Sequence, residues 1–360
     1  MKICFLADIN SYHTQNWCKY FVGNGYDVHV ISISNGSFDG VKVHSLEFSE
    51  SLSKKEKSFN KLSYLKRISN IKKIVNDIKP DILHAHYASS YGLFGALCNY
   101  KPYIISLWGS DILLFPKEGF IQKNIIKFNF KKANTILATS DYMKEEAKLY
   151  TNKEVYVTPF GIDTNVFFNR NIRNNQSLTI GIVKSLEKIY GINYLIEAVS
   201  NLIKKYPNMD INLKIVGEGT QKDELLKLVS NMNINNKVEF LGKLTSVEVA
   251  DFYNKVDIAA FPSLSESFGV SVLEAQACGA AVVVSDIKAF YETTKVNESS
   301  LLCKVKDVES LEKSLEKLVL DSDLREAMGR VGSDFVRENF SKEDMFKKIE
   351  SIYEKVLKKN

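Results

Sequence analysis

The chain contains 360 residues, of which 45% are hydrophobic and 25% charged, a composition typical of a soluble globular protein. Its length predicts two domains, each able to bury its own core. The five cysteines are scattered and form no CxxC pair, which argues against a disulfide framework or a zinc site and indicates a reducing compartment.

The beginning of the chain, MKICFLADINSYH, has an apolar run too short for a signal peptide. No stretch approaches the ~18 apolar residues that a membrane span needs. We therefore expect a cytoplasmic protein. The net charge of +5 is uneven, because residues 1–165 carry 21 Lys or Arg against 15 Asp or Glu.

Short β-rich runs alternate with amphipathic helical segments in the first half. The predicted strands are 2–7, 27–33, 81–85, 103–107, 135–138 and 155–158, and the predicted helices are 13–22, 58–78, 91–99, 120–132 and 142–150. This alternation predicts a parallel sheet covered on both faces, with ligands beyond the carboxyl ends of the strands. The loops 8–13, 86–90 and 108–113 are expected at that edge.

A polar segment without periodicity, 169–176, is the predicted linker, and a second alternating series follows it. Its predicted strands are 178–183, 211–216, 238–241, 257–261 and 281–285, and its predicted helices are 191–205, 221–232, 246–254 and 270–278. Beyond residue 308 the chain is helical and highly charged, and a last helix begins at Ser341. We predict domains over 1–168 and 177–340, followed by a terminal helix over 341–360.

The stretch 260–286 predicts a strand, a loop, a helix and a second strand. Glu266 lies on the loop and Glu274 inside the helix, on either side of a helix N-terminus near Phe268, Gly269 and Val270. Backbone N–H groups at such an end bind anions, and glycine allows close approach. Glu274 can then accept two hydroxyl groups of a ribose. Spacing alone equally predicts an ordinary capped surface helix.

The run from Glu266 to Gly279, ESFGVSVLEAQACG, resembles the E-x7-E signature of glycosyltransferase family 4. The resemblance covers nearly the whole chain and is sharpest over 181–286, although Ala281 replaces the usual Pro. It implies retaining enzymes of the GT-B fold, an α/β architecture of two Rossmann-like domains facing across a cleft. In that family the final helix commonly returns to the first domain.

The loop 181–191 follows a strand and precedes a helix, so its Lys184 and Lys188 are expected to point toward the phosphates. The resemblance implies an Arg and a Lys there to neutralise a leaving diphosphate. Lys184 takes the place of the Arg, which keeps the charge and loses the bidentate fork. Two solvated lysines are the alternative. We include Gly217, in a tight turn after a strand, and Leu241 among the donor-binding residues.

Segments 11–17 and 84–92 resemble acceptor-side loops of a family 4 subgroup, and they include His13 and His86. LWGSD, ending at Asp111, resembles the H-G-x-D segment, with Trp108 in place of the His. We assign Asp111 and His86 to the acceptor side and expect His13 to orient the acceptor. A histidine at a helix start is as often structural.

The resemblance implies transfer of a sugar from a nucleoside-diphosphate sugar to a glycan or lipid-linked acceptor, in cell-surface polysaccharide or glycolipid assembly. Lys184, Lys188 and the N–H groups near Gly269 are expected to stabilise the departing diphosphate, while Glu266 holds the donor sugar. No enzyme nucleophile, metal, cofactor or nucleic-acid partner is expected. Asp321 and Asp323 favour a helix cap over a metal site.

Two other classes of protein are alternatives. A non-catalytic protein that binds sugar nucleotides stays open because Trp108 and Lys184 depart from the family pattern. A nicotinamide dehydrogenase is disfavoured, since Lys222 stands where the G-x-G-x-x-G fingerprint needs its third glycine.

Basic residues in the first half predict weak association with an anionic membrane on its inner face. Residues 54–79 hold nine basic and two acidic side chains, and 117–132 hold five lysines among aromatic residues. The alternative is a solvated basic surface above a buried aromatic face.

Overall fold

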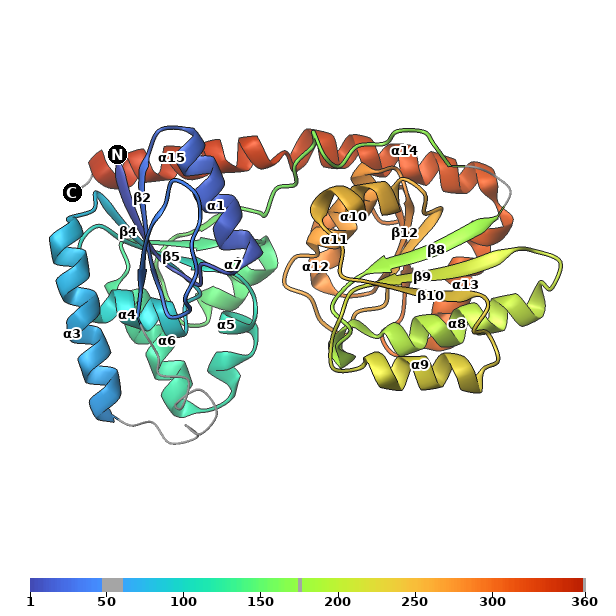
Figure 1. Cartoon of the computed structure of the whole chain (residues 1–360), viewed down its shortest axis with the longest axis horizontal. Helices are drawn as coiled ribbons and strands as arrows, with labels where there is room; N and C mark the ends of the chain where they lie inside the picture. Colours follow the sequence, from blue (N-terminus) through green and yellow to red (C-terminus); the bar gives the residue numbers. More distant parts are fainter. Residues whose placement is uncertain (47–60, 174–176, 359–360) are drawn as a thin grey trace. The chain divides into compact units, whose positions relative to one another are not determined.

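The computed structural model describes residues 1–46, 61–173 and 177–358. They form two compact units (Figure 1). The first unit comprises Met1–Pro159 and Phe346–Asn360, and the second comprises Phe160–Met345. Each contains a parallel sheet with helices on both faces, which confirms the predicted architecture of two α/β domains.

The sheet of the first unit has seven parallel strands in the order β3-β2-β1-β4-β5-β6-β7. They are β1 (Lys2–Leu6), β2 (Asp27–Ser32), β3 (Lys42–Ser45), β4 (Ile82–His86), β5 (Tyr103–Leu107), β6 (Thr135–Ala138) and β7 (Val155–Val157). The described helices are α1 (Tyr12–Gly23), α3 (Lys61–Ile78), α4 (Ser90–Cys98), α5 (Ser110–Leu113), the 3-10 helix η1 (Phe115–Lys117), α6 (Phe120–Lys132), α7 (Asp141–Lys148) and α15 (Lys342–Lys358).

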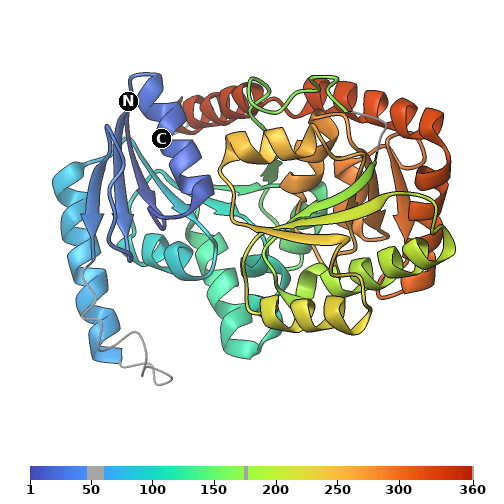
Figure 2. The same ribbon diagram turned by 45° about the vertical axis from the view of Figure 1, so that its right-hand side comes forward.

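Side chains alternate between the two faces of this sheet, as the period of a strand requires. Helices α3, α4 and α6 cover one face, and α1 and α15 cover the other (Figures 1 and 2). On the second face, Phe5 of β1 lies 5.9 Å from the rings of both Trp17 and Phe21 in α1. Tyr353 of α15 is also buried there, and its hydroxyl is 2.6 Å from His84 Nδ1. The last helix is thus part of the first unit's core.

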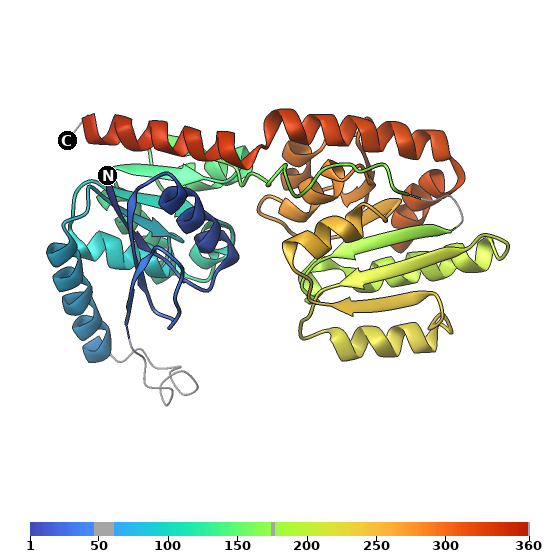
Figure 3. The same cartoon turned by 45° about the horizontal axis from the view of Figure 1, so that its top comes forward.

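The second unit has a six-stranded parallel sheet in the order β10-β9-β8-β11-β12-β13. The strands are β8 (Leu178–Val183), β9 (Ile211–Val216), β10 (Val238–Gly242), β11 (Ile258–Phe261), β12 (Ala281–Ser285) and β13 (Ser300–Cys303). The described helices are η2 (Lys188–Tyr190), α8 (Ile192–Lys205), α9 (Lys222–Asn231), α10 (Ser246–Tyr253), α11 (Val270–Ala277), α12 (Lys288–Thr293), α13 (Val308–Leu320) and α14 (Ser322–Asn339). Helices α8, α9 and α13 lie on one face, and α10, α11 and α14 on the other (Figure 3).

The boundary between the units falls at Pro159 rather than at the predicted residue 168. Ile162 and Phe167 are 3% exposed and belong to the second unit's core, so this segment packs with the sheet that follows it.

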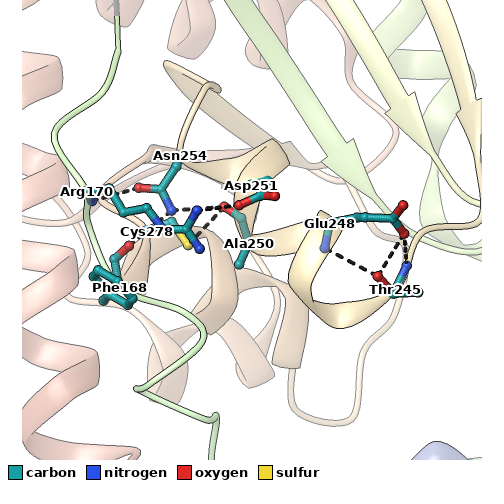
Figure 4. A network of polar contacts seen from close by, with 8 residues as sticks. All are labelled: Phe168, Arg170, Thr245, Glu248, Ala250, Asp251, Asn254 and Cys278. Carbon is teal, nitrogen blue, oxygen red and sulfur yellow. Dashed lines mark hydrogen bonds and ion pairs between the residues drawn. The ribbon is translucent and has the colours of Figure 1, made fainter.

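Part of the predicted linker is likewise attached to the second unit. The Arg170 side chain forms an ion pair with Asp251, and the Arg170 backbone N–H donates to the side-chain oxygen of Asn254 (Figure 4). The Arg173 guanidinium donates to the carbonyl groups of Val256, Tyr253 and Cys278. Residues 174–176 lie outside the described residues. The described part of the predicted linker is therefore attached to the second unit by the polar contacts of Arg170 and Arg173.

Most predicted elements occur within a few residues of their predicted ends. The sequence does not predict β3, β13, α5 and α12, which have four to six residues each. Asp321 accepts a hydrogen bond from Leu324 N at 2.9 Å and begins α14, which confirms the predicted helix cap. Across the described segments, no helix combines the length and apolar character needed to cross a membrane.

Candidate functional site

The second unit places its predicted site where the strand order reverses. From β8 the chain moves outward through β9 and β10 on one side, and then returns to β11 on the other. Ligands of such sheets bind at the carboxyl ends of the strands that flank this reversal. Lys184 and Lys188 follow β8, and Glu266 follows β11. The two flanking strands thus deliver the predicted charged residues to one edge.

The loop after β8 is held against the loop after β9. Lys184 N donates to Val216 O at 3.0 Å, and Leu186 N donates to Glu218 O at 3.0 Å. Gly217 has a φ of +139°, and a Cβ atom there would lie 1.9 Å from the Lys184 carbonyl oxygen. Only glycine permits this contact, so Gly217 is needed to place the backbone of Lys184.

The same loop is fixed on its other side to the loop after β11. Leu264 N donates to Ile189 O at 2.8 Å. Gly191, with a φ of +64°, lies so close to Pro262 that a Cβ atom would be 2.2 Å from its carbonyl oxygen. The loop that carries Lys184 is therefore attached to both neighbours.

An ion pair joins the two flanking loops. The Lys184 ammonium contacts Glu266 Oε1, and the two side chains are only 11% and 9% exposed. Lys184 Nζ also lies 4.7 Å from the centroid of the Tyr190 ring, a cation–π contact. Ser263 Oγ donates to Glu266 Oε1 at 3.4 Å. These contacts give both charges fixed positions with little solvent around them.

Helix α11 begins beside this pair, at Gly269. The φ of Gly269 is +98°, and a Cβ atom there would lie 2.9 Å from the Phe290 ring. Phe268 is 1% exposed, with ring centroids 6.3 Å from Phe160 and 5.8 Å from Phe340. This packing anchors the helix start, where the first N–H groups have no acceptor within the helix and can bind an anion.

Glu274 lies just beyond the first turn of α11 and is half-buried. Desolvation raises its pKa to about 7, although the positive charge of Lys184 opposes the shift. Close to neutral pH the carboxyl group is therefore divided between its protonated and ionised forms. Such a displaced pKa beside a fixed ion pair is a common property of functional sites.

The remaining donor-side predictions have less definite surroundings. Lys188 is exposed on η2, and the described contacts do not bring its side chain to the Lys184–Glu266 pair. Leu241 is half-buried at an irregularity in β10, where the register with β9 shifts between Phe240 and Gly242. The Gly242 carbonyl accepts from Gly217 N at 2.8 Å, so Leu241 adjoins the glycine turn.

The first unit gathers aromatic and histidine side chains where its strand order reverses, between β1 and β4. The ring of Trp108 lies 5.7 Å from that of His13, on α1, and 4.4 Å from that of His86, the last residue of β4. Burial lowers the pKa of His13 to about 4 and the pKa of His86 well below its ordinary value. Both imidazoles are therefore neutral near pH 7.

Asp111 joins two loops at this edge of the first unit through hydrogen bonds. It is 1% exposed and accepts hydrogen bonds from the backbone N–H groups of Ala88, Gly109 and Trp108 at 2.7, 2.8 and 3.2 Å. Burial raises the pKa of Asp111 despite these three donors. The carboxylate thus ties the loop after β4 to the loop after β5.

Two contributors at these sites carry no signal in the sequence. Tyr190 and Ser263 contact the ion pair only because their loops fold together, and no motif marks either residue. His86, which the sequence assigns to the acceptor side, is 1% exposed, and within the described residues neither of its ring nitrogens has a hydrogen-bond partner. This lack of a partner is evident only once the surroundings of the imidazole are known.

Comparison with known proteins gives matches in both units. A family model described as "Glycosyl transferase 4-like" matches residues 2–140, and one described as "Glycosyl transferases group 1" matches residues 163–334. An uncharacterized glycosyltransferase of Methanocaldococcus jannaschii is 27% identical over 307 residues, which are 83% of each chain. The N-acetyl-alpha-D-glucosaminyl L-malate synthase of Bacillus anthracis is 26% identical over 77% of this chain and 75% of its own.

A solved structure supports the fold. Anabaena HepE in complex with UDP superposes with a TM-score of 0.80 at 16% identity, over 99% of this chain and 100% of that chain. The same protein has also been solved with UDP-glucose, with a TM-score of 0.78. At this identity the likeness concerns the fold, and it confirms the predicted GT-B class.

The raised pKa of Glu274 predicts a stability that depends on pH. The folded protein binds this proton more tightly than the unfolded chain, so the contribution is present below pH ~4.5 and is lost as pH rises through about 7. Glu274→Gln stays neutral, so at pH 8 it should be more stable than the wild type by up to about 3 kcal/mol. Urea unfolding between pH 4.5 and 8 measures this difference, which should nearly vanish at the acidic end.

Glu298→Gln, at an exposed glutamate of the same unit, is the control and should show no such trend. A stability gain in Glu274→Gln that does not change with pH would contradict the assigned pKa.

Proposed function

The chain belongs to the family 4-like, group 1 glycosyltransferases, and we propose that it moves a sugar from a nucleoside-diphosphate sugar to an acceptor hydroxyl with retained anomeric configuration. The observation that supports this most directly is the Lys184–Glu266 pair beside the start of α11, with Glu274 further along the same helix. The capsular polysaccharide biosynthesis glycosyltransferase CapM of Staphylococcus aureus is 26% identical over 63% of this chain, and together with the basic first half this similarity supports an acceptor in cell-surface polysaccharide or glycolipid assembly.

In this proposal the nucleoside diphosphate lies along the start of α11. The backbone N–H groups near Gly269 and Val270 receive the phosphates, and Glu274 accepts hydrogen bonds from the ribose hydroxyl groups. Those hydroxyl groups favour the ionised carboxylate, which offsets part of its desolvation. UDP-glucose, one of the ligands named for HepE, is the first donor to try, and UDP is the nucleoside diphosphate that its transfer would release.

The ion pair supplies the chemistry of the leaving group. Negative charge grows on the diphosphate as the bond to the sugar breaks, and the Lys184 ammonium is held where it can stabilise that charge. Diphosphate then replaces Glu266 as the main partner of Lys184. This frees the Glu266 carboxylate to hold the sugar hydroxyl groups and to face the positive charge near the anomeric carbon. Lys188, exposed on η2, adds a second cation.

On the acceptor side we assign His13 to orienting the attacking hydroxyl. Its lowered pKa makes it neutral, so it can accept a hydrogen bond from that hydroxyl without adding charge. Asp111 and His86 support the surrounding loops. The acceptor oxygen bonds to the anomeric carbon on the face from which the diphosphate leaves, and its proton passes to the departing phosphate oxygen, so no enzyme nucleophile is required.

Binding of donors tests the proposal directly. UDP-, GDP-, ADP- and CMP-sugars are added in turn, and the melting temperature is recorded. A ligand at 100 times its Kd stabilises the folded state by about 2.7 kcal/mol, so a true donor should raise Tm clearly. Release of free nucleoside diphosphate upon adding acceptor then shows transfer. No stabilisation by any sugar nucleotide would contradict the proposal, and binding without release would favour the non-catalytic alternative.

Substitution of Glu266 and substitution of Glu274 should affect different kinetic parameters. Glu274 touches the ribose equally in the ground and transition states, so Glu274→Gln should raise the donor KM and leave kcat less affected. Glu266 faces charge that develops only in the transition state, so Glu266→Gln should lower kcat by roughly two orders of magnitude while nucleoside diphosphate still binds. Steady-state kinetics and calorimetric titration with nucleoside diphosphate separate the two effects.

Glu298→Gln serves again as the matched control and should behave as wild type. Near-normal kcat in Glu266→Gln, or loss of nucleotide binding as severe as in Glu274→Gln, would contradict this division of roles.

We propose that transfer needs no metal ion. Within the described residues, no group of three or more His, Cys, Asp or Glu side chains converges on a point. In this proposal Lys184, Lys188 and the start of α11 provide the charge that Mg²⁺ or Mn²⁺ gives other enzymes. Turnover should therefore persist in excess EDTA, as measured by nucleoside diphosphate release. Activity that disappears in chelator and returns with Mg²⁺ or Mn²⁺ would contradict it.

We also propose that the protein acts at the cytoplasmic face of an anionic membrane. Of the basic stretch 54–79 that suggests this, residues 54–60 lie outside the described residues. The second stretch, 117–132, is described in full and carries five lysines. Lysines near an anionic surface each add about 1 kcal/mol to membrane binding.

A further inference from the structure

We propose that Leu114, Phe120 and Ile121 form an insertion tip that enters an anionic lipid bilayer and holds the acceptor-side loops at its surface. This rests on the proposed function and deepens it by naming the surface that docks. The three residues lie in the connection from β5 to α6, in the first unit.

The exposure of this tip is unusual for large apolar side chains. Phe120 is 82% exposed, Ile121 71% and Leu114 51%. Ile126 and Phe130, further along α6, are fully buried against the sheet. One side of α6 therefore faces the core in the usual way. At its first turn, Phe120 and Ile121 are in addition exposed to solvent within the described chain. Clustered exposed apolar residues commonly mark an interaction surface.

The backbone that presents the tip is well ordered by hydrogen bonds. Leu114 N donates to Ser110 O at 3.1 Å, and Lys117 N donates to Leu114 O at 2.9 Å. Asn124 Nδ2 donates to Phe120 O at 2.8 Å, inside the first turn of α6. Lys117 Nζ lies 3.1 Å from Glu146 Oε2, which ties η1 to α7. These contacts fix the backbone of the connection, so Leu114, Phe120 and Ile121 have little freedom to turn inward.

The charge around the tip selects an anionic bilayer as its partner. Residues 115–132 include five lysines and one acidic residue, Glu118. Lys123, Lys127 and Lys131 are exposed on α6 behind the tip. At 1.5 Å per residue, Lys123 and Lys127 lie about 5 and 10 Å from Phe120 along the helix axis.

These distances match the depth at which interfacial helices bind. Apolar side chains in such helices enter about 5–10 Å into the boundary between headgroups and acyl chains. If α6 enters end-on, insertion of Phe120 and Ile121 to that depth would place Lys123 and Lys127 near the lipid phosphates. Lys117 contributes less, because Glu146 already neutralises part of its charge.

Topology places the tip beside the acceptor-side loops. Trp108 and Asp111 precede Leu114 in the same connection after β5, and Asp111 binds Ala88 in the loop after β4. These segments all leave the carboxyl edge of the sheet. Docking through the tip therefore brings this edge to the membrane, where an acceptor anchored in lipid can reach it.

Co-sedimentation with vesicles tests the tip. Wild-type protein, Phe120→Ser/Ile121→Ser and the control Leu149→Ser/Leu320→Ser are mixed at low salt with phosphatidylglycerol–phosphatidylcholine vesicles or with pure phosphatidylcholine vesicles. Leu149 and Leu320 are 65% and 55% exposed, so the control removes comparable apolar surface elsewhere. All four altered residues are exposed, so each variant should fold, and its melting temperature verifies this.

The wild type and the control should bind the anionic vesicles, and the tip variant should bind about tenfold more weakly or worse. Equal binding by both variants would overturn the tip and leave only a diffuse basic surface. Absence of binding by the wild type would also overturn it. A wild-type dimer that the tip variant loses, seen by light scattering without vesicle binding, would assign the tip to self-association instead.

These outcomes do not depend on catalysis. Vesicle binding needs neither donor nor acceptor, and thermal shift with sugar nucleotides is measured without lipid. A protein that binds vesicles but no sugar nucleotide would contradict the proposed sugar transfer and leave the tip standing. The reverse result would contradict the tip and the proposed membrane location, and would leave the proposed sugar transfer standing.

Discussion

The ion pair between Lys184 and Glu266 is the contact on which the site of the second unit depends. Its two side chains come from loops after different strands, so their meeting requires both loops to be held close. Gly217 and Gly191 permit that approach, because any side chain there would collide with a carbonyl oxygen. An ion pair as little exposed as this one contributes little net stability, since desolvation offsets much of the Coulomb attraction. Its fixed geometry is better explained by a ligand whose charges replace one member of the pair.

The two units differ in how they use polar groups. The second unit keeps charges at its edge, with Lys184 and Glu266 paired and Glu274 shifted to a pKa of about 7. At the corresponding edge of the first unit, burial keeps His13 and His86 neutral. This contrast agrees with a charged diphosphate on one unit and a neutral hydroxyl acceptor on the other. Trp108, which replaces a histidine of the family pattern, contacts both imidazoles through its ring.

Much of this arrangement could be predicted from sequence because its signals are local. Strand β12 is a short run of β-branched residues, helix α8 has strong helical periodicity, and the E-x7-E spacing lies within one loop and one helix. The carboxyl edge of each sheet follows from the alternation of elements. What could not be predicted depends on contacts between distant segments. The sequence assigns Asp111 to the acceptor side, but its hydrogen bond to the N–H group of Ala88 in the loop after β4 depends on the fold.

The same limit applies to segments with misleading composition. Arg173 lies in a polar stretch that indicates a linker, yet its guanidinium satisfies carbonyl groups about 80 to 105 residues away in sequence. In α6, helical spacing cannot decide which of several apolar residues face the core. Packing against the sheet buries Ile126 and Phe130, and the geometry of a helix then forces Phe120 outward.

Three features at the two sheet edges are unfavourable for an isolated chain. They are a carboxyl group with a displaced pKa at Glu274, a buried imidazole at His86 to which the described residues offer no hydrogen-bond partner, and large apolar side chains in solvent at Phe120 and Ile121. Each one lowers the stability of the isolated chain, because a satisfied or buried alternative has lower free energy. Local exceptions of this kind are expected where function requires them. They lie at the carboxyl edges of the two sheets, where ligands of parallel sheets bind, and this position agrees with the contacts proposed for substrate and membrane.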